Sequence, residues 1–345
     1  MAAPWHGTCS GQAVIRTLLV CVLAAQEPQP DFVATYNFVT APVTVRDSRG
    51  RIVNGLTEQD FQLFDKGVPQ KVTEDEVSHP ISMVVAVQAS GNMEKLLPGI
   101  RKLGNLINQF VLGENGELAV LAFDHRIQTM TGFTSDPDQI SSAFKNVKSG
   151  SGSSHLNDAA MNAIHLLRTR PRERRRILLL IAETHDYGSE VTQRDVSIEA
   201  GFADVVIYSV GVSSFLASLT SKTEPPRPNP IPPEARMLPA GVIGTLTTDS
   251  QGQMGNLVPI KDTFKANLNA VYARITGGRE YSYLTQRGLE QAIVDLGEEI
   301  HSQYLLTYLP SNREEIGDHD IEVKVSKPGM VVRTRTSYSI APALK

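Results

Sequence analysis

The spacing of hydrophobic positions changes along the chain, and each change marks a different kind of structure. Between residues 36 and 79, apolar and polar residues alternate, as in Val43-Thr44-Val45, which is the period of a strand with one buried face. From residue 80 to 302, continuous apolar runs such as Ile81 to Val87 are followed by stretches with helical spacing. A run that is apolar throughout is typical of a strand covered on both faces. The pattern therefore predicts a small β unit followed by an α/β domain.

Strands and helices alternate regularly within this second segment. Buried strands are predicted at residues 81–87, 118–123, 127–133, 177–182 and 205–210. Helices are predicted at residues 96–110, 136–147, 158–167, 191–203, 264–275 and 289–300. Strands that alternate with helices of about 10–15 residues form crossover units. The predicted fold class is therefore α/β, with a doubly wound, mostly parallel sheet of Rossmann-like type.

Small β segments flank this domain at both ends. Strand-like runs at 304–308, 321–325 and 331–336 are separated by turns, which predicts antiparallel hairpins over residues 303–340. We expect these hairpins to pack with the N-terminal β unit. Inside the α/β domain, the Pro-rich stretch 224–233 excludes helix and central strand, so we interpret residues 213–262 as an extended surface loop.

The N-terminal segment has the pattern of an export signal. Arg16 precedes the apolar run Thr17 to Ala25, which ends in small residues and is followed by a Pro-rich stretch. A charge, a short apolar run and a small-residue end are typical of a secretory signal peptide, and the run is too short to span a membrane. We predict a signal peptide at 1–25, a linker at 26–35, and an exported protein, periplasmic or extracellular, without a membrane span. Both cysteines, Cys9 and Cys21, lie in the signal, so the mature chain would offer no thiolate ligand.

Composition and charge exclude one class of partner. The chain has 345 residues and a formal net charge of −4, so no general attraction to nucleic acid is expected. The segment 168–176 is rich in arginine, but no aromatic residue is interleaved with the basic ones. We therefore interpret it as a solvated loop before a hydrophobic strand and not as a polyanion site.

Candidate chemistry is concentrated where the predicted strands end. In an open parallel sheet, ligands bind beyond the carboxyl ends of the strands. Two loops rich in side-chain oxygen follow these ends, at residues 88–94 and 183–189, and a third, at residues 151–157, is expected at the same edge. We call these three loops, which form the top face of the domain, the rim. Oxygen ligands of this kind can hold a hard cation such as Mg²⁺.

Several short motifs, taken in order, carry a family resemblance. Val43 to Asp47, Gly55 to Phe61 and Asp65 to Gln70 stand near the N-terminus, and Gln303 to Pro310 stands near the C-terminus. Their order and spacing resemble von Willebrand factor type A proteins, in particular the VWFA-related proteins best known from Acidobacteria. The resemblance covers nearly the whole mature chain. It implies a von Willebrand factor type A (VWA) fold and a use in adhesion or protein binding.

The same resemblance implies a degenerate metal site. In this family the rim carries a metal-ion-dependent adhesion site, with Asp-x-Ser-x-Ser in the first loop, a Thr in the second and an Asp in the third. The corresponding residues in this chain are Gln88, Ser90, Asn92, Ser154 and Glu183. An amide thus replaces the first acid, and the last acid has a longer stem. Because Mg²⁺ requires near-ideal octahedral geometry and negative charge, we expect no cofactor and no tightly bound metal. Weak Mg²⁺ or Mn²⁺ binding, with Asp186 as a second acid, is the alternative.

These observations lead to a functional expectation with two alternatives. We expect a secreted, non-enzymatic module whose rim contacts a protein or a surface polymer, with Ser90, Asn92, Ser154 and Glu183 as hydrogen-bonding contacts. One alternative is a structural component of an envelope assembly that docks through its C-terminal strands and the Pro-rich loop, with an inert rim. The other is a metal-dependent adhesion domain.

The sequence supports an enzyme less well than it supports these non-enzymatic functions. Ser90, His185 and Asp186 provide the residue types of a serine hydrolase. The sequence around Ser90 lacks the Gly-x-Ser-x-Gly turn that exposes such a serine at the end of a strand. We therefore do not expect catalysis.

Overall fold

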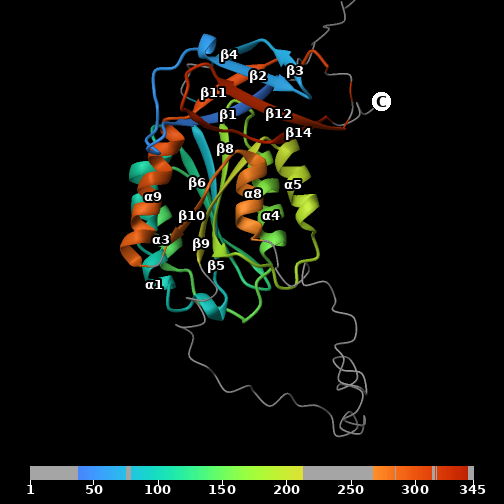
Figure 1. Cartoon of the computed structure of the whole chain (residues 1–345). Helices are drawn as coiled ribbons and strands as arrows, with labels where there is room; N and C mark the ends of the chain where they lie inside the picture. Colours follow the sequence, from blue (N-terminus) through green and yellow to red (C-terminus); the bar gives the residue numbers. More distant parts are fainter. Residues whose placement is uncertain are drawn as a thin grey trace, which may run out of the picture. The chain divides into compact units, whose positions relative to one another are not determined.

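A computed structural model of the chain describes residues 38–74, 79–212, 267–283, 285–312, 315 and 317–340 (Figure 1). These residues belong to one unit, Asn37–Lys345. The expected signal peptide (1–25), linker (26–35) and Pro-rich loop (213–262) lie outside the described residues. In the described ranges, no helix has the length and apolar character that crossing a membrane requires.

The central sheet has the strand order β10-β9-β8-β5-β6-β7. Its strands are β5 (Ile81–Gln88), β6 (Glu117–Phe123), β7 (Ile127–Thr134), β8 (Arg175–Glu183), β9 (Val205–Val212) and β10 (Glu280–Tyr283). Neighbouring strands run parallel except β7, which pairs antiparallel with β6. Every residue of β5 is buried, because helices cover both faces of the sheet. The predicted α/β class with a mostly parallel sheet is confirmed.

Two hydrophobic cores lie on the two faces of this sheet. The helices are α1 (Leu97–Ile100), α2 (Leu103–Ile107), α3 (Pro137–Lys145), α4 (Leu156–Arg168), α5 (Gln193–Phe202), α8 (Leu268–Thr276) and α9 (Gln286–His301). Side chains of β5 alternate between the cores: Met83, Val85 and Val87 pack with α1, α2, α3 and α9, whereas Val84 and Ala86 pack with α4, α5 and α8. Figure 1 shows the two helical layers on either side of the strands. This alternation is the expected geometry of a strand buried on both faces.

The helix predicted at 96–110 is divided into short pieces. The chain forms α1, α2 and a π-type turn η3 (Asn108–Leu112) in place of one regular helix. Pro98 stands at the first turn of α1, where its missing N–H is tolerated. Close packing by α9 also shapes this region, since a Cβ on Gly297 would lie 2.1 Å from the Phe110 carbonyl oxygen. Helical spacing alone could not predict these interruptions.

The remaining strands form two antiparallel sheets that share one core. The first sheet has the order β13-β1-β11-β4 and the second β14-β12-β2-β3. Their strands are β1 (Val39–Arg46), β2 (Phe61–Asp65), β3 (Val68–Gln70), β4 (Val72–Glu74), β11 (Tyr304–Tyr308), β12 (Gly317–Val325), β13 (Val331–Arg333) and β14 (Ser337–Ile340). We call these two sheets the sandwich. Their common core takes residues from both ends of the unit.

The C-terminal strands do not form the hairpins that the turns predict. β11 pairs with β1 and β4, β12 pairs with β2 and β14, and β13 pairs with β1. Each C-terminal strand except β14 therefore pairs with an N-terminal strand. Local turn signals indicate where the chain reverses, but they do not say which distant strand will cover an apolar face.

The basic run at 168–176 is not the solvated loop that the sequence suggested. The Arg175 guanidinium donates to the Ile300 carbonyl at 2.7 Å, near the end of α9. The buried Arg176 donates to the Ala203 carbonyl at 2.8 Å, at the end of α5. Helix C-termini leave carbonyl groups without intrahelical partners, and a cation stabilises them. The solvated interpretation is therefore wrong for these two residues, which satisfy helix ends.

Candidate functional site

The rim lies where β5 and β8 end side by side. Gln88 is the last residue of β5 and Glu183 the last residue of β8, and these two strands are parallel neighbours. Backbone hydrogen bonds join the loops that follow: Gly91 N–H donates to Ser151 O at 2.8 Å, and Tyr187 N–H donates to Ser154 O at 2.8 Å. The three predicted loops thus form one connected surface at this end of the sheet.

A buried hydrogen-bond network connects three of the predicted site residues. The Gln88 side-chain nitrogen donates to Ser90 Oγ at 2.7 Å and to Glu183 Oε2 at 2.9 Å. The Gln88 side-chain oxygen accepts from the Glu183 backbone N–H at 2.8 Å. Gln88 therefore binds Glu183 at two points and Ser90 at a third.

The orientation of the Gln88 amide follows from its partners. Its oxygen faces an N–H group, and its nitrogen faces a carboxylate oxygen and a hydroxyl. The reverse orientation would place two oxygens against each other at Glu183 and two donors against each other at the backbone. The nitrogen is therefore the atom that lies between Ser90 and Glu183.

The structure places the other two predicted residues differently. Ser154 forms an isolated bridge with Tyr187, and its buried hydroxyl has no hydrogen-bond partner among the described residues. Asn92 lies in the short turn η2 (Gly91–Met93), and its side chain is outside the described set. The structure thus connects Gln88, Ser90 and Glu183, but it gives Ser154 no bond to them.

The connected residues lie beneath the surface of the rim. Gln88 and Ser90 are fully buried, Ser154 is 1% exposed and Glu183 is 3% exposed. Side chains at this depth contact other parts of the same chain, whereas the sequence predicts direct contacts of Ser90, Ser154 and Glu183 with a partner. Their observed contacts hold the loops in place.

Two other acids at the rim accept hydrogen bonds from residues of the rim loops. Asp186 accepts from Ser189 Oγ at 2.6 Å and from Asn157 N–H at 3.1 Å, so it joins the third rim loop to the start of α4. Asp124, which the sequence analysis missed, follows β6 and accepts from Ser151 N–H at 2.9 Å. Burial raises the pKa of Asp124, but backbone hydrogen bonds outweigh burial and lower that pKa below its ordinary value. Its position directly after a buried strand was the available signal.

These residues do not fit a divalent cation. Cations require lone pairs directed at one point, but the N–H groups of Gln88 point at the Ser90 hydroxyl and the Glu183 carboxylate. Within the described ranges, no group of three or more His, Cys, Asp or Glu side chains is arranged to hold a metal ion. The amide nitrogen of Gln88 donates hydrogen bonds to both oxygens, Ser90 Oγ and Glu183 Oε2.

The residue types of a serine hydrolase are present, but the hydrogen bonds of the described residues do not join them into a catalytic triad. The Ser90 hydroxyl is buried and bonded to Gln88, His185 Nδ1 lies 2.9 Å from Thr184 Oγ1, and Asp186 is bonded to its own loop. The described contacts therefore provide no base for the serine. A nucleophile needs such a base within hydrogen-bond reach.

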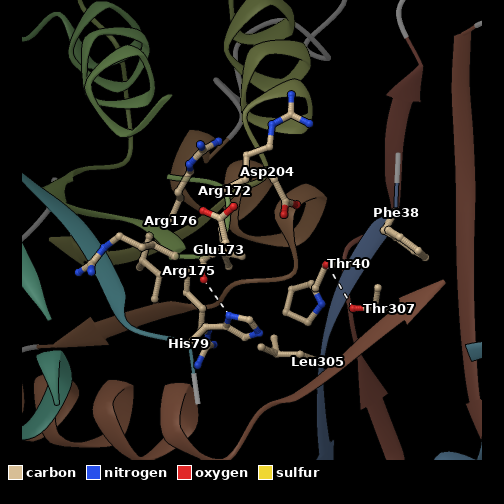
Figure 2. Close-up of a pocket in the computed structure, with 14 residues that line it drawn as sticks. Phe38, Thr40, His79, Arg172, Glu173, Arg175, Arg176, Asp204, Leu305 and Thr307 are labelled. Atoms are coloured by element: carbon tan, nitrogen blue, oxygen red, sulfur yellow. Dashed lines mark hydrogen bonds between the residues drawn. The ribbon is translucent and has the colours of Figure 1, made fainter. Parts of the chain in front are cut away.

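A separate cavity of about 190 Å³ lies at the opposite end of β8, beside the sandwich (Figure 2). β1 and β11 form one wall through residues such as Thr40 and Leu305, and the segment 172–177 forms another. His79 Nδ1 lies 2.7 Å from the Glu173 carbonyl oxygen at its edge. Two of its arginines, Arg175 and Arg176, are engaged at helix ends as described above. The rim remains the better candidate, because its polar groups converge.

Comparison with known proteins agrees with the fold. The von Willebrand factor type A domain family matches residues 83–184, from within β5 to just after β8. This part of the chain is similar to a VWA domain. The matched segment contains the first two rim loops and the start of the third. Domains of this family are typically interaction modules without enzymatic activity.

Several solved structures are similar to this chain. A von Willebrand factor type A protein from Catenulispora acidiphila is 8% identical, with a TM-score of 0.46, over 90% of this chain and 65% of that chain. An aerotolerance-related membrane protein from Bacteroides fragilis is 13% identical, with a TM-score of 0.39, over 63% of this chain and 98% of that chain. The conserved hypothetical protein BatB from Bacteroides thetaiotaomicron is 13% identical, with a TM-score of 0.40, over 64% of this chain and 97% of that chain. No curated protein sequence matches the chain.

Proposed function

We propose that this protein is an exported, non-enzymatic binding module. The rim of its VWA domain contacts another protein or a surface polymer, without a tightly bound metal. One observation carries this proposal: the rim presents an exposed aromatic residue, Tyr187, on loops that buried hydrogen bonds hold in place.

Tyr187 has the properties of a contact residue. It is 42% exposed, and its ring lies 6.4 Å from the ring of His185. Tyrosine is enriched among the residues that dominate binding energy, because it provides a large contact area with few rotatable bonds. An exposed tyrosine at the end of a parallel sheet thus favours binding at this face.

The backbone around Tyr187 is held on both sides. Its N–H donates to the Ser154 carbonyl, and its own carbonyl accepts from Ser153 Oγ at 2.6 Å. A contact residue on a fixed loop loses less conformational entropy on binding than one on a mobile loop. The buried residues Gln88, Ser90 and Glu183 support the same loops from below. In this proposal they position the binding face and do not touch the partner.

Export is supported by sequence only. Residues 1–25 have the charge, the apolar run and the small-residue end of a secretory signal. Both cysteines of the chain lie in this segment, which suits a mature protein that needs no disulfide. We place the mature protein in the periplasm or outside the cell.

The decisive experiment compares two aromatic residues of equal exposure. Phe202, at the end of α5, is 42% exposed like Tyr187 but lies outside the rim. Wild-type protein, Tyr187→Ala and Phe202→Ala are used as baits in envelope extract, and bound proteins are quantified by mass spectrometry. We expect Tyr187→Ala to capture at least about tenfold less of the specific partner than wild type does, a typical effect for an aromatic hot spot. Phe202→Ala should retain it, and equal retention by both variants would contradict a role for the rim.

One observation favours a second candidate, a structural component of an envelope assembly. β13 is an edge strand of its sheet, and Val331 at its start is 62% exposed. An edge strand with an exposed apolar residue can pair with another chain. If Val331→Lys abolishes capture and Tyr187→Ala does not, docking through the sandwich replaces the rim as the proposed function.

A further inference from the structure

The position of the Gln88 amide nitrogen carries an inference about how the rim is held together. This nitrogen lies 2.7 Å from Ser90 Oγ and 2.9 Å from Glu183 Oε2. In a metal-dependent rim, a hydroxyl and an acid at these two places would face a cation. We propose that the Gln88 amide takes the place of that cation and makes the rim independent of divalent ions. This role deepens the proposed metal-free function and does not depend on which partner binds.

The hydrogen-bonding capacity of the amide matches its surroundings. A glutamine side chain has two N–H donors and one carbonyl acceptor. One donor binds Ser90, the other binds Glu183, and the carbonyl accepts from the Glu183 backbone. No N–H group of Gln88 is left to point into empty space. A cation in the same place would meet donors where it needs lone pairs.

Charge explains why a neutral amide suits this position. Glu183 is 3% exposed, and a buried carboxylate is unfavourable unless donors or a positive charge compensate it. The Gln88 N–H group provides such compensation at 2.9 Å. An acid at position 88 would set a second negative charge against Glu183, and two carboxylates that share a site disfavour joint ionisation. Only a cation or a proton would then stabilise the pair.

The amide also ties together the ends of two strands. Gln88 ends β5 and Glu183 ends β8, and the first and third rim loops begin at these two residues. A bound ion can dissociate, and chelators remove it. An amide that is part of a side chain cannot be removed in this way. The loops should therefore keep their arrangement in the presence of a chelator.

The test is thermal unfolding, followed by circular dichroism, in a chelator and then in Mg²⁺, Mn²⁺ or Ca²⁺. Wild-type protein should melt at the same temperature in all four conditions. Gln88→Glu keeps the side-chain length but removes the donor, and its melting temperature in chelator should fall by about 5–10 °C. At least one of the three ions should raise the melting temperature of this variant by about 3–6 °C, because it now binds between two carboxylates.

Two control variants separate this effect from general ones. Gln88→Met removes the amide without adding a carboxylate, so it should be destabilised in chelator and gain nothing from the ions. Gln62→Glu adds a carboxylate at an exposed position of β2, so it should match wild type in every condition.

Three outcomes would overturn the proposal. The first is a metal-induced rise in the melting temperature of the wild-type protein. The second is a Gln88→Glu variant as stable as wild type in chelator, since the amide would then hold nothing together. The third is a destabilised Gln88→Glu variant that none of the ions restores, since the amide nitrogen would then not lie where a cation can bind. These readouts require no partner, so they are independent of the capture experiment with Tyr187→Ala.

Discussion

At the scale of single residues, a buried acid organises the sandwich. Asp65 ends β2 and is fully buried. It accepts hydrogen bonds from Tyr338 OH at 2.6 Å and Tyr308 OH at 3.1 Å, lies 2.8 Å from His319 Nδ1, and accepts from Asn312 Nδ2 at 3.2 Å. These partners come from both sheets of the sandwich and from the loop after β11. One carboxylate thus connects segments that lie far apart in the sequence.

Replacing this acid should destabilise the protein in a pH-dependent way. Burial raises the pKa of Asp65, but hydrogen bonds from Tyr338, His319 and Asn312 outweigh burial and lower that pKa below its ordinary value of 3.8. A lowered pKa contributes stability that is complete above the ordinary value and is lost as the pH falls through the lowered one. We expect Asp65→Asn to lose about 3–5 kcal/mol of unfolding free energy at pH 7 in urea titrations.

The difference between wild type and Asp65→Asn should shrink as the pH falls below about 4, because the carboxyl of the unfolded chain is protonated there, and the folded carboxyl follows below its lowered pKa. The control is Asp320→Asn, an exposed position on β12, which should stay within about 0.5 kcal/mol of wild type. A loss at Asp65 that stays the same from pH 7 down to about pH 2 would contradict the ionised state of this carboxyl.

At the scale of elements, arginines near the start of β8 stabilise helix ends. Arg176 is 7% exposed and donates to the last carbonyl of the α5 region, and Arg175 donates to Ile300 in α9. Burial lowers the pKa of both guanidinium groups. The start of β8 and the two helix ends meet at the same end of the sheet, as the hydrogen bonds from Arg175 and Arg176 show.

Two arginines of this run should differ sharply in their effect on stability. Arg176→Gln removes a donor and leaves the Ala203 carbonyl without its partner, so we expect a loss of about 1–3 kcal/mol of unfolding free energy. Arg172→Gln changes an exposed side chain that has no ion pair within the described ranges, so it should change stability by less than about 0.5 kcal/mol. Urea unfolding measures both, and equal losses would restore the interpretation as a solvated loop.

At the scale of the whole unit, a buried acid joins the sandwich to the α/β domain. Glu299 of α9 is fully buried and pairs with Arg46 of β1 at 3.0 Å, with Arg279 at 3.6 Å, and with Arg333 of β13. Arg46 and Arg333 belong to the sandwich, so the acid binds cations from both parts. A buried charge that loses its partner is strongly destabilising, which makes this contact sensitive to mutation.

Glu299→Gln should therefore weaken the junction between the two parts. We expect a loss of about 3–5 kcal/mol of unfolding free energy, because three arginines lose one shared counter-charge. The adjacent Glu298 is exposed, so Glu298→Gln is a matched control that should leave stability unchanged. Circular dichroism at increasing temperature gives both midpoints, and a Glu299→Gln midpoint equal to that of the control would show that the arginines are stabilised without the acid.

The strands and their class could be predicted from the sequence, because burial leaves a local pattern. Ile81 to Val87 is apolar at every position, which requires cover on both faces, and β5 is buried throughout. The oxygen-rich loops after β5 and β8 could be located for the same reason, since the carboxyl ends of parallel strands meet at one edge. The interruption of the helix at 96–110 could not be predicted, because it depends on how closely α9 approaches at Gly297.

By itself, the sequence determined the order of elements, the parallel sheet and the place of the rim, since these follow from hydrophobic period and chain direction. Only the tertiary structure decided that Gln88 turns its amide nitrogen toward Ser90 and Glu183, and that the arginines before β8 satisfy helix ends. It also decided that C-terminal strands pair with N-terminal ones. These are contacts between residues far apart in the chain, and their geometry depends on packing that no local pattern records.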